Sequence, residues 1–187
     1  MADKETGIWD STDLKKEHKH DIKLAESIAL MFKPKKMADL GCGDGWYCHY
    51  LKVEKDWPMV HGYEGNIYEL KRKHFYDDIT IIDLSKIKYV DMFYDLVICL
   101  EVGEHIPQKH EQKFLDNIAR FTTKDLILSW AIPGQGGRGH FNEQPNDYII
   151  KEMSKRGFAF DKEKAELLRK DTIYKWFRNT IMVFEKI

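Results

Sequence analysis

The chain has 187 residues, and its 43% hydrophobic and 33% charged residues give the balance of a folded globular domain. A formal net charge of −1 leaves no general excess of the lysine and arginine that bind nucleic-acid phosphates, so we do not expect a nucleic-acid partner. No segment is apolar enough for a signal peptide or a membrane span, and the three cysteines form no C-x-x-C pair. We therefore expect a cytoplasmic protein with reduced thiols and no membrane partner, and the sequence does not indicate its oligomeric state.

The length suits one domain over residues 1–187, with an N-terminal arm and helix over 1–33 and a core over 34–187. Hydrophobic periodicity predicts helices that alternate with strands. In chain order the expected elements are a helix over 12–32, a strand over 37–40, a helix over 46–55, a strand over 59–63, a helix over 67–75, strands over 79–83 and 95–100, a helix over 110–121, a strand over 125–131, a helix over 145–156 and a strand over 179–185. This alternation predicts an α/β fold with a doubly wound, mostly parallel sheet, whose ligands bind at the carboxyl ends of the strands.

Residues 38–46 read ADLGCGDGW and place glycines at alternate positions between an expected strand and an expected helix. Glycine is needed there because a side chain would block the approach of the backbone to a ligand. A dinucleotide fingerprint, G-x-G-x-x-G, needs glycine at position 46, which is Trp46 in this chain. No G-x-x-x-x-G-K-[ST] loop exists either, so the spacing excludes a P-loop nucleotide hydrolase.

The stretch DLGCGDG from Asp39 to Gly45 resembles the first motif of class I S-adenosylmethionine-dependent methyltransferases, in particular the small single-domain members. The resemblance implies a seven-stranded Rossmann-like fold with an N-terminal helical arm, a methyltransferase activity and S-adenosyl-L-methionine as the cofactor. It also implies that this loop binds the methionine half of the cofactor. The cofactor-binding residues expected from this loop are Asp39, Gly41, Cys42, Gly43, Gly45 and Trp46.

The next two strands each end in an acidic residue. Glu64 follows the glycine loop by about twenty residues, the spacing at which a carboxylate accepts hydrogen bonds from ribose hydroxyls. Asp83 and Leu84 end the following strand, where the resemblance implies contact with the adenine ring through the carboxylate and the next backbone N–H. The alternative for Asp83 is a cap on the element that follows it.

Residues 101–106 read EVGEHI and resemble the E-x-x-E-H-[ILV] sequence of the fourth motif region in the same superfamily. Three hypotheses remain open for Glu101, Glu104 and His105, which share one face if they form a helical turn. His105 is a general base oriented by Glu104, or the three residues bind a divalent metal with His140 as a further ligand, or they are structural and Glu101 touches the cofactor. The expected catalytic residues are His105, His140 and Glu104.

Four glycines within residues 134–139 predict a loop at the carboxyl edge of the sheet, where binding residues concentrate. We expect Arg138 and Asn142 on this loop, together with Trp9 on the N-terminal arm, to bind the substrate. The first hypothesis for the reaction is O-methylation of a small hydroxylated acceptor, such as a sugar or a nucleotide-linked sugar. The alternatives are O-methylation of an RNA ribose and a non-catalytic module that only binds the cofactor.

Overall fold

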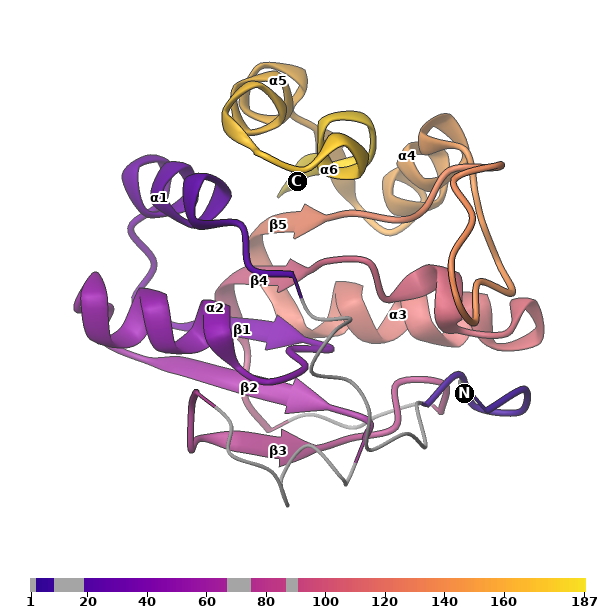
Figure 1. The fold of residues 1–187 in the computed structure, drawn as a ribbon, viewed down its shortest axis with the longest axis horizontal. Helices are drawn as coiled ribbons and strands as arrows, with labels where there is room; N and C mark the ends of the chain where they lie inside the picture. Colours follow the sequence, from indigo (N-terminus) through magenta and orange to yellow (C-terminus); the bar gives the residue numbers. More distant parts are fainter. Residues whose placement is uncertain (1–2, 9–18, 67–74, 87–90) are drawn as a thin grey trace.

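A computed structural model of the chain describes residues 3–8, 19–66, 75–86 and 91–187 (Figure 1). Three expectations fall outside these residues. They are the helix over 67–75 except for its last residue, Phe75, the first part of the helix over 12–32, and the substrate contact Trp9.

A seven-stranded sheet forms the centre of the molecule, with the strand order β3-β2-β1-β4-β5-β7-β6. The strands are β1 Met37–Leu40, β2 Val60–Glu64, β3 Ile79–Ile81, β4 Tyr94–Cys99, β5 Thr122–Leu128, β6 Phe158–Phe160 and β7 Met182–Lys186. The strands β1 to β5 are parallel to one another, and β7 runs antiparallel to both β5 and β6. The predicted doubly wound, mostly parallel sheet is thereby confirmed, because the order reverses between β1 and β4.

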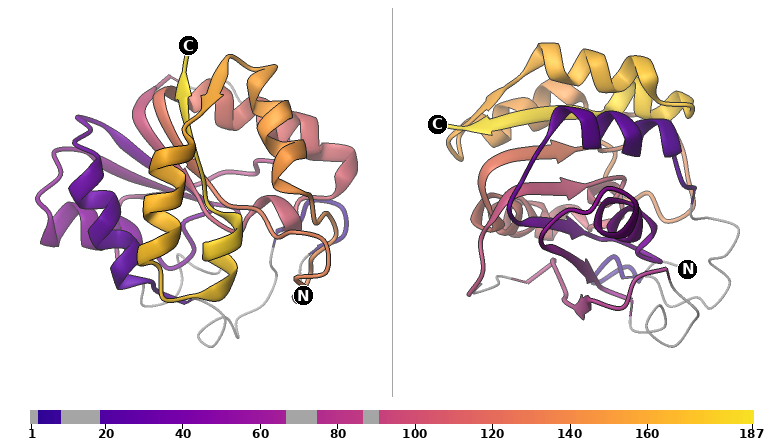
Figure 2. Two further views of the ribbon diagram at one scale, coloured as in Figure 1. Left: turned by 90° about the horizontal axis from the view of Figure 1, so that it is seen from above. Right: turned by 90° about the vertical axis from the view of Figure 1, so that its left-hand side faces the viewer.

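Helices cover both faces of the sheet (Figures 1 and 2). They are α1 Ile22–Met31, α2 Trp46–His49 continued by the π-helix η2 Tyr50–Glu54, the 3₁₀ turns η4 Gly103–His105 and η5 Gln108–His110, α3 Glu111–Phe121, α4 Asn146–Ser154, α5 Lys162–Asp171 and α6 Lys175–Thr180. The helix α1 lies beside α5, although the two are far apart in the chain (Figure 2, left). No helix in the described part of the chain has both the length and the apolar character needed to cross a membrane.

The central strands are buried on both faces, which explains why their sequences are almost continuously apolar. Met37 and Leu96 pack in one core cluster with residues of α1, α5 and α6. Their neighbours Ala38 and Val97 pack in a second cluster with residues of α3 and α4. Successive side chains of a strand point to opposite faces, so two separate cores hold the strand ends in place.

Three elements near the C-terminus, β6, α5 and α6, have no counterpart in the sequence prediction. The sequence of α5, KEKAELLRKD, buries only Ala165 and Leu168, so it carries little of the apolar periodicity that identifies a helix. The strand expected over 179–185 begins later, at Met182, because residues 175–180 form α6.

Candidate functional site

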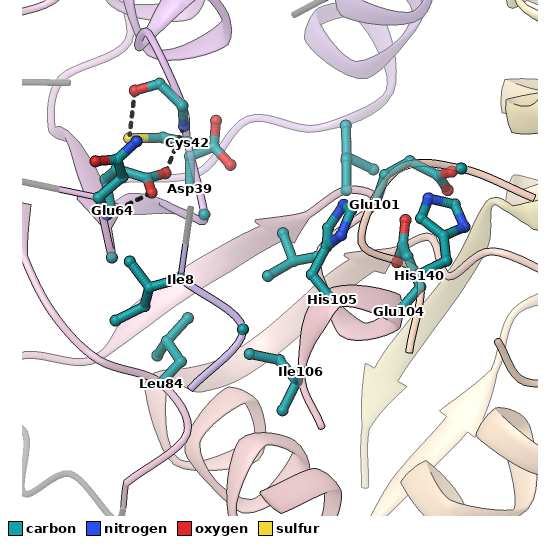
Figure 3. Close-up of a pocket in the computed structure, with 18 of the residues that line it drawn as sticks. Ile8, Asp39, Cys42, Glu64, Leu84, Glu101, Glu104, His105, Ile106 and His140 are labelled. Carbon is teal, nitrogen blue, oxygen red and sulfur yellow. Dashed lines mark hydrogen bonds between the residues drawn. The ribbon is translucent and has the colours of Figure 1, made fainter. Parts of the chain in front are cut away.

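A cavity of about 640 Å³ lies at the carboxyl ends of the parallel strands. Figure 3 shows two groups of polar side chains in it. Asp39, Cys42 and Glu64 form one group, beside β1 and β2, and Glu101, Glu104, His105 and His140 form the other, beyond β4. The apolar side chains of Ile8, Leu84 and Ile106 also line the cavity and lie below these two groups in the view of Figure 3.

The glycine loop after β1 forms one wall of the cavity. Gly41 has φ +79°, and a Cβ atom on it would lie 2.4 Å from Cγ2 of Val102, so only glycine fits there. The N–H groups of Gly41 and Cys42 donate to the carbonyl oxygen of Tyr63, which ties the loop to β2. The N–H of Gly43 donates to Oε2 of Glu64 at 2.8 Å. The chain therefore brings the loop and the carboxylate at the end of β2 together.

Two acidic side chains lie under this loop. The carboxylate of Glu64 also accepts from the N–H of Asn66 at 2.8 Å, which fixes it at the cavity wall. Asp39 is buried at the end of β1, and Sγ of Cys48 donates to it at 3.8 Å. Burial, together with the nearby Glu64 carboxylate, raises the pKa of Asp39 to about 7. Near neutral pH the Asp39 carboxyl beneath the loop is therefore only partly ionised.

Asp83 and Leu84 lie on the cavity wall after β3. The carboxylate of Asp83 accepts from the N–H and Oγ of Ser85 at 2.9 and 2.6 Å, and it pairs with Lys86 at 2.9 Å. Burial alone would raise the pKa of Asp83, but these hydrogen bonds hold it below its ordinary value. Asp83 thus caps a turn, as the alternative prediction proposes, while its residue still lines the cavity.

Glu101 connects three segments at the other end of the cavity. Its φ of +53° is rare for a residue other than glycine. Its N–H donates to Oγ of Ser129 at 2.8 Å, and its carboxylate accepts from Gln135 at 2.7 Å and from Thr180 at 3.2 Å. Burial raises the pKa of Glu101, and the three hydrogen bonds only partly oppose that effect. The strained backbone and the buried carboxylate make this an energetically costly arrangement of the kind found at functional sites.

Glu104, His105 and His140 form a compact cluster beside Glu101. One potential ligand atom from each of the three lies within 4.8 Å of the others. Glu104 is fully buried, and neither of its carboxylate oxygens has a hydrogen-bond partner among the described residues. Burial, reinforced by the charge of Glu101, raises the pKa of Glu104 well above its ordinary value. The group includes His140, which the metal hypothesis names as a further ligand, but it does not include Glu101.

Both histidines of the cluster are oriented through Nδ1. That atom of His105 lies 3.0 Å from the carbonyl oxygen of Gly139, and that of His140 lies 3.2 Å from Oε1 of Glu143. Glu143 also accepts from the N–H groups of Gly134 and Gly136, which shape the loop. Because a carbonyl or carboxylate acceptor fixes the proton on Nδ1, the lone pair lies on Nε2 of each ring.

Comparison with known proteins agrees with this geometry. A family model described as a methyltransferase domain matches residues 38–128, which include the glycine loop, Glu64 and the EVGEHI segment. Residues 38–128 therefore form a methyltransferase domain, and the seven-stranded sheet has the Rossmann-like fold of the class I S-adenosylmethionine-dependent methyltransferases. The prediction of the family, of the enzyme class and of S-adenosyl-L-methionine as the cofactor is confirmed.

Several solved methyltransferase structures share the fold. Magnesium protoporphyrin IX methyltransferase from Synechocystis PCC 6803 with bound S-adenosylmethionine has a TM-score of 0.64 at 20% identity, over 88% of this chain and 76% of that one. The methyltransferase domain of bacterial CtHen1-C has a TM-score of 0.63 at 18% identity, over 88% and 97%. The sugar N-methyltransferase KedS8 from Streptoalloteichus has a TM-score of 0.68 at 13% identity, over 88% and 87%. No curated protein matches the sequence significantly.

The cavity of this methyltransferase fits its cofactor. Its volume lies within the usual range for sites that enclose small ligands. A glycine loop without side chains at its closest approach and a carboxylate at the end of β2 suit a ligand with ribose hydroxyls. Asp39, Gly41, Cys42, Gly43, Glu64, Asp83, Leu84 and Glu101 all line the cavity, as the sequence analysis expects for cofactor-binding residues.

Three expected contacts of the methyltransferase lie elsewhere. Gly45 and Trp46 are not among the described residues that line the cavity. Gly45 caps the start of α2, and the ring of Trp46 stacks on the rings of His20 and Tyr50. Asn142, expected to bind the substrate, is buried outside the cavity, whereas Arg138 on the same loop does line it.

Other lining residues were not singled out by the sequence. The N-terminal residues Thr6, Gly7 and Ile8 reach the cavity because Gly7 packs directly on the backbone carbonyl of His105. The sequence signal for these residues is the apolar pair Gly7-Ile8 on an N-terminal arm that is otherwise mostly charged. Trp176 and Phe177 line the cavity from α6, a helix too short for its periodicity to be recognised.

Proposed function

We propose that this enzyme methylates a hydroxyl group of a small hydroxylated acceptor, such as a sugar, and that Glu104, His105 and His140 hold a divalent metal ion beside that hydroxyl. The observation that carries the proposal is the buried Glu104 carboxylate without a hydrogen-bond partner, next to two imidazoles. A buried carboxylate in that condition is costly, and a cation would offset the cost.

The orientation of the two histidines supports a metal site. Histidines that bind metals usually donate their other N–H to a carbonyl or a carboxylate, which fixes the ring. Gly139 and Glu143 provide such acceptors here. Two imidazoles and one carboxylate form a donor set that suits divalent transition metals and leaves coordination positions for other oxygen ligands.

The cofactor end of the cavity would hold S-adenosylmethionine through the residues that line it. We assign the ribose hydroxyls to Glu64, the adenine to Asp83 and Leu84, and the methionine half to the loop from Asp39 to Gly43. S-adenosylmethionine supplies the methyl group as an electrophile, so the protein has to hold the acceptor in line and favour loss of its proton. Positive charge held by Glu104, His105 and His140 would favour the ionised form of a hydroxyl there.

A sugar-like acceptor follows from the same donor set. Neighbouring hydroxyls are oxygen ligands that can fill the open coordination positions of a divalent ion. Arg138 and the glycine-rich loop lie at the same end of the cavity and would contact the rest of the acceptor. The fold match to a sugar N-methyltransferase supports a sugar-sized acceptor, and the match to a bacterial Hen1 domain makes an RNA ribose the alternative outcome of the same test.

The test measures transfer of a labelled methyl group to a panel of sugars, nucleotide-linked sugars and a short RNA, with Mn²⁺ and with chelator. We expect chelator to abolish transfer and Mn²⁺ to restore it. His105→Ala and His140→Ala should each lower turnover roughly 10²–10⁴-fold, with little change in the affinity for S-adenosylmethionine. His49→Ala is the matched control, because His49 is half-buried on α2 and is not among the lining residues.

Indifference to chelator would overturn the metal proposal. If both histidine variants then still lost activity, with a pH–rate limb near a pKa of about 6.5, one of the two histidines would act as a general base instead. Methyl transfer to the RNA alone would replace the sugar with a polynucleotide ribose, and its rate should then fall steeply with added salt.

A further inference from the structure

Glu111 is a buried carboxylate outside the cavity, at the first position of α3, with 3% of its surface exposed. It accepts hydrogen bonds from Nδ2 of Asn142 at 2.8 Å, from Nε2 of Gln144 at 3.0 Å, from Nε2 of Gln112 at 3.3 Å and from the hydroxyl of Tyr148. All these donors are neutral, although a buried carboxylate is more usually paired with a cation. The group therefore needs an explanation other than charge pairing.

Asn142 links this carboxylate to the proposed metal ligands. Its N–H donates to the carbonyl oxygen of Glu104 at 3.0 Å, and the N–H of Phe141 donates to the same oxygen at 2.8 Å. Its own carbonyl accepts from Nε1 of the buried Trp130 at 2.5 Å. The segment that follows His140 is thus fixed on the backbone of the turn η4, which carries both Glu104 and His105.

The two imidazoles face one another as a result. The ring centroids of His105 and His140 lie 5.0 Å apart in an edge-to-face arrangement. His140 belongs to a glycine-rich loop, which on its own would hold a side chain poorly. Besides the bond of its ring to Glu143, His140 is held by the N–H groups of Phe141 and Asn142, which fix the chain directly after it on the turn η4.

We propose that Glu111 is a positioning residue, which holds Asn142 so that the loop presents His140 to Glu104 and His105. Glutamate suits this role because its carboxylate only accepts, and four donors converge on it. A glutamine at this position would put an N–H group in place of one acceptor oxygen, so the amide donors on that side would lose their acceptor. The inference rests on the proposed function, because it gives the geometry of the Glu104, His105 and His140 cluster a role in metal binding.

The experiment uses Glu111→Gln, with Glu152→Gln as the matched control. Glu152 is equally buried, on α4, but it pairs with Arg156 and Lys155 and has no bond to the loop. Three quantities are measured for each protein. They are the affinity for Mn²⁺ alone and the affinity for S-adenosylhomocysteine, both by calorimetry, and the hydrogen-exchange protection of the amides of Phe141 and Asn142, by NMR.

Glu111→Gln should weaken Mn²⁺ binding roughly 10–100-fold, expose the two amides to exchange and leave the affinity for S-adenosylhomocysteine within about twofold. Glu152→Gln should leave all three quantities unchanged. The double variant Glu111→Gln with Asn142→Asp restores a donor–acceptor pair with reversed polarity, so it should recover metal affinity and protection. This double variant keeps the test decisive if the single variant does not fold.

Unchanged Mn²⁺ affinity and unchanged protection in Glu111→Gln would overturn the inference, and so would an equal loss in Glu152→Gln. Absence of Mn²⁺ binding in the unmodified enzyme would instead overturn the metal part of the proposed function. In that case the exchange of the Phe141 and Asn142 amides still decides whether Glu111 positions the loop.

Discussion

Asp39→Asn should change how the stability of the enzyme depends on pH. Asp39 is buried beneath the glycine loop with a pKa of about 7, against an ordinary value of 3.8. Between these two pH values the folded protein keeps a proton on this carboxyl that the unfolded chain releases. Stability therefore falls as pH rises from about 4 to about 7 and levels off above that, because the folded state then has to bury the charge.

The size of the effect follows from the difference in pKa. A separation of about three pH units corresponds to about 4 kcal/mol over the whole range, at about 1.4 kcal/mol for each pH unit. Between pH 5 and pH 8 the contribution of Asp39 to the free energy of unfolding should fall by about 3 kcal/mol. Asparagine has nearly the same shape and carries no charge, so Asp39→Asn removes this contribution. The wild type should therefore lose about 3 kcal/mol more stability than the variant over that interval.

Urea unfolding at pH 5 and pH 8, without cofactor, measures the difference. Cofactor is left out because binding would stabilise the folded state and hide the effect. The raised pKa values of Glu101 and Glu104 influence both proteins equally and cancel in the comparison. Asp91→Asn, at an exposed position, is the control and should leave the pH dependence unchanged. Parallel stability curves for the wild type and Asp39→Asn would refute the argument that burial of this carboxyl controls its ionisation.

Two further substitutions test the cofactor end of the cavity. Glu64→Ala should weaken the binding of S-adenosylmethionine by about 2–3 kcal/mol in calorimetry, because the ribose loses a charged acceptor; an unchanged dissociation constant would remove Glu64 from the site. Gly41→Ala should lower the free energy of unfolding by about 2–4 kcal/mol in urea titration, because the new methyl group would lie 2.4 Å from Val102 at a positive φ. Gly134→Ala has a similar φ of +86° but nothing within 4 Å of the new atom, so a loss as large as that of Gly41→Ala would show that the contact with Val102 is unimportant.

The elements that the sequence predicts correctly are those that a local hydrophobic pattern identifies. The strand over 37–40 is found at the same residues, and the helix over 110–121 begins one residue later, because continuous apolar runs and amphipathic periodicity identify them. The helices α5 and α6 escape prediction because their stability comes from tertiary packing. Few of their residues are buried, and α5 packs against α1, α6 and β7, of which α1 is distant from it in the chain.

The same distinction applies to the site. The glycine loop, Glu64 and the EVGEHI segment are recognisable because each stands at the end of a strand, where parallel topology brings ligands. Asn142 was expected to contact the substrate because it is polar and lies on the glycine-rich loop. Its burial depends on Glu111, which is distant in the chain, and no local pattern carries that pairing. Trp46 likewise stacks on His20, a contact that only the folded chain creates.

The strand order explains why the methyl donor and the methyl acceptor can bind in the same cavity. The strand order reverses between the parallel strands β1 and β4, so the loops that follow these two strands leave the sheet on opposite sides and open a cleft between them. Gly41 and Val102 are where the two loops touch, and the absence of a side chain at Gly41 allows that contact. Glu101, next to Val102, bonds to Thr180 of α6 and to Gln135 of the glycine-rich loop. The cofactor loop, the cluster of Glu104, His105 and His140, and the elements that follow β5 are therefore parts of one packed unit. A change at Gly41 should for this reason disturb methyl transfer as well as cofactor binding, whereas a change at Glu111 should act on the acceptor end alone.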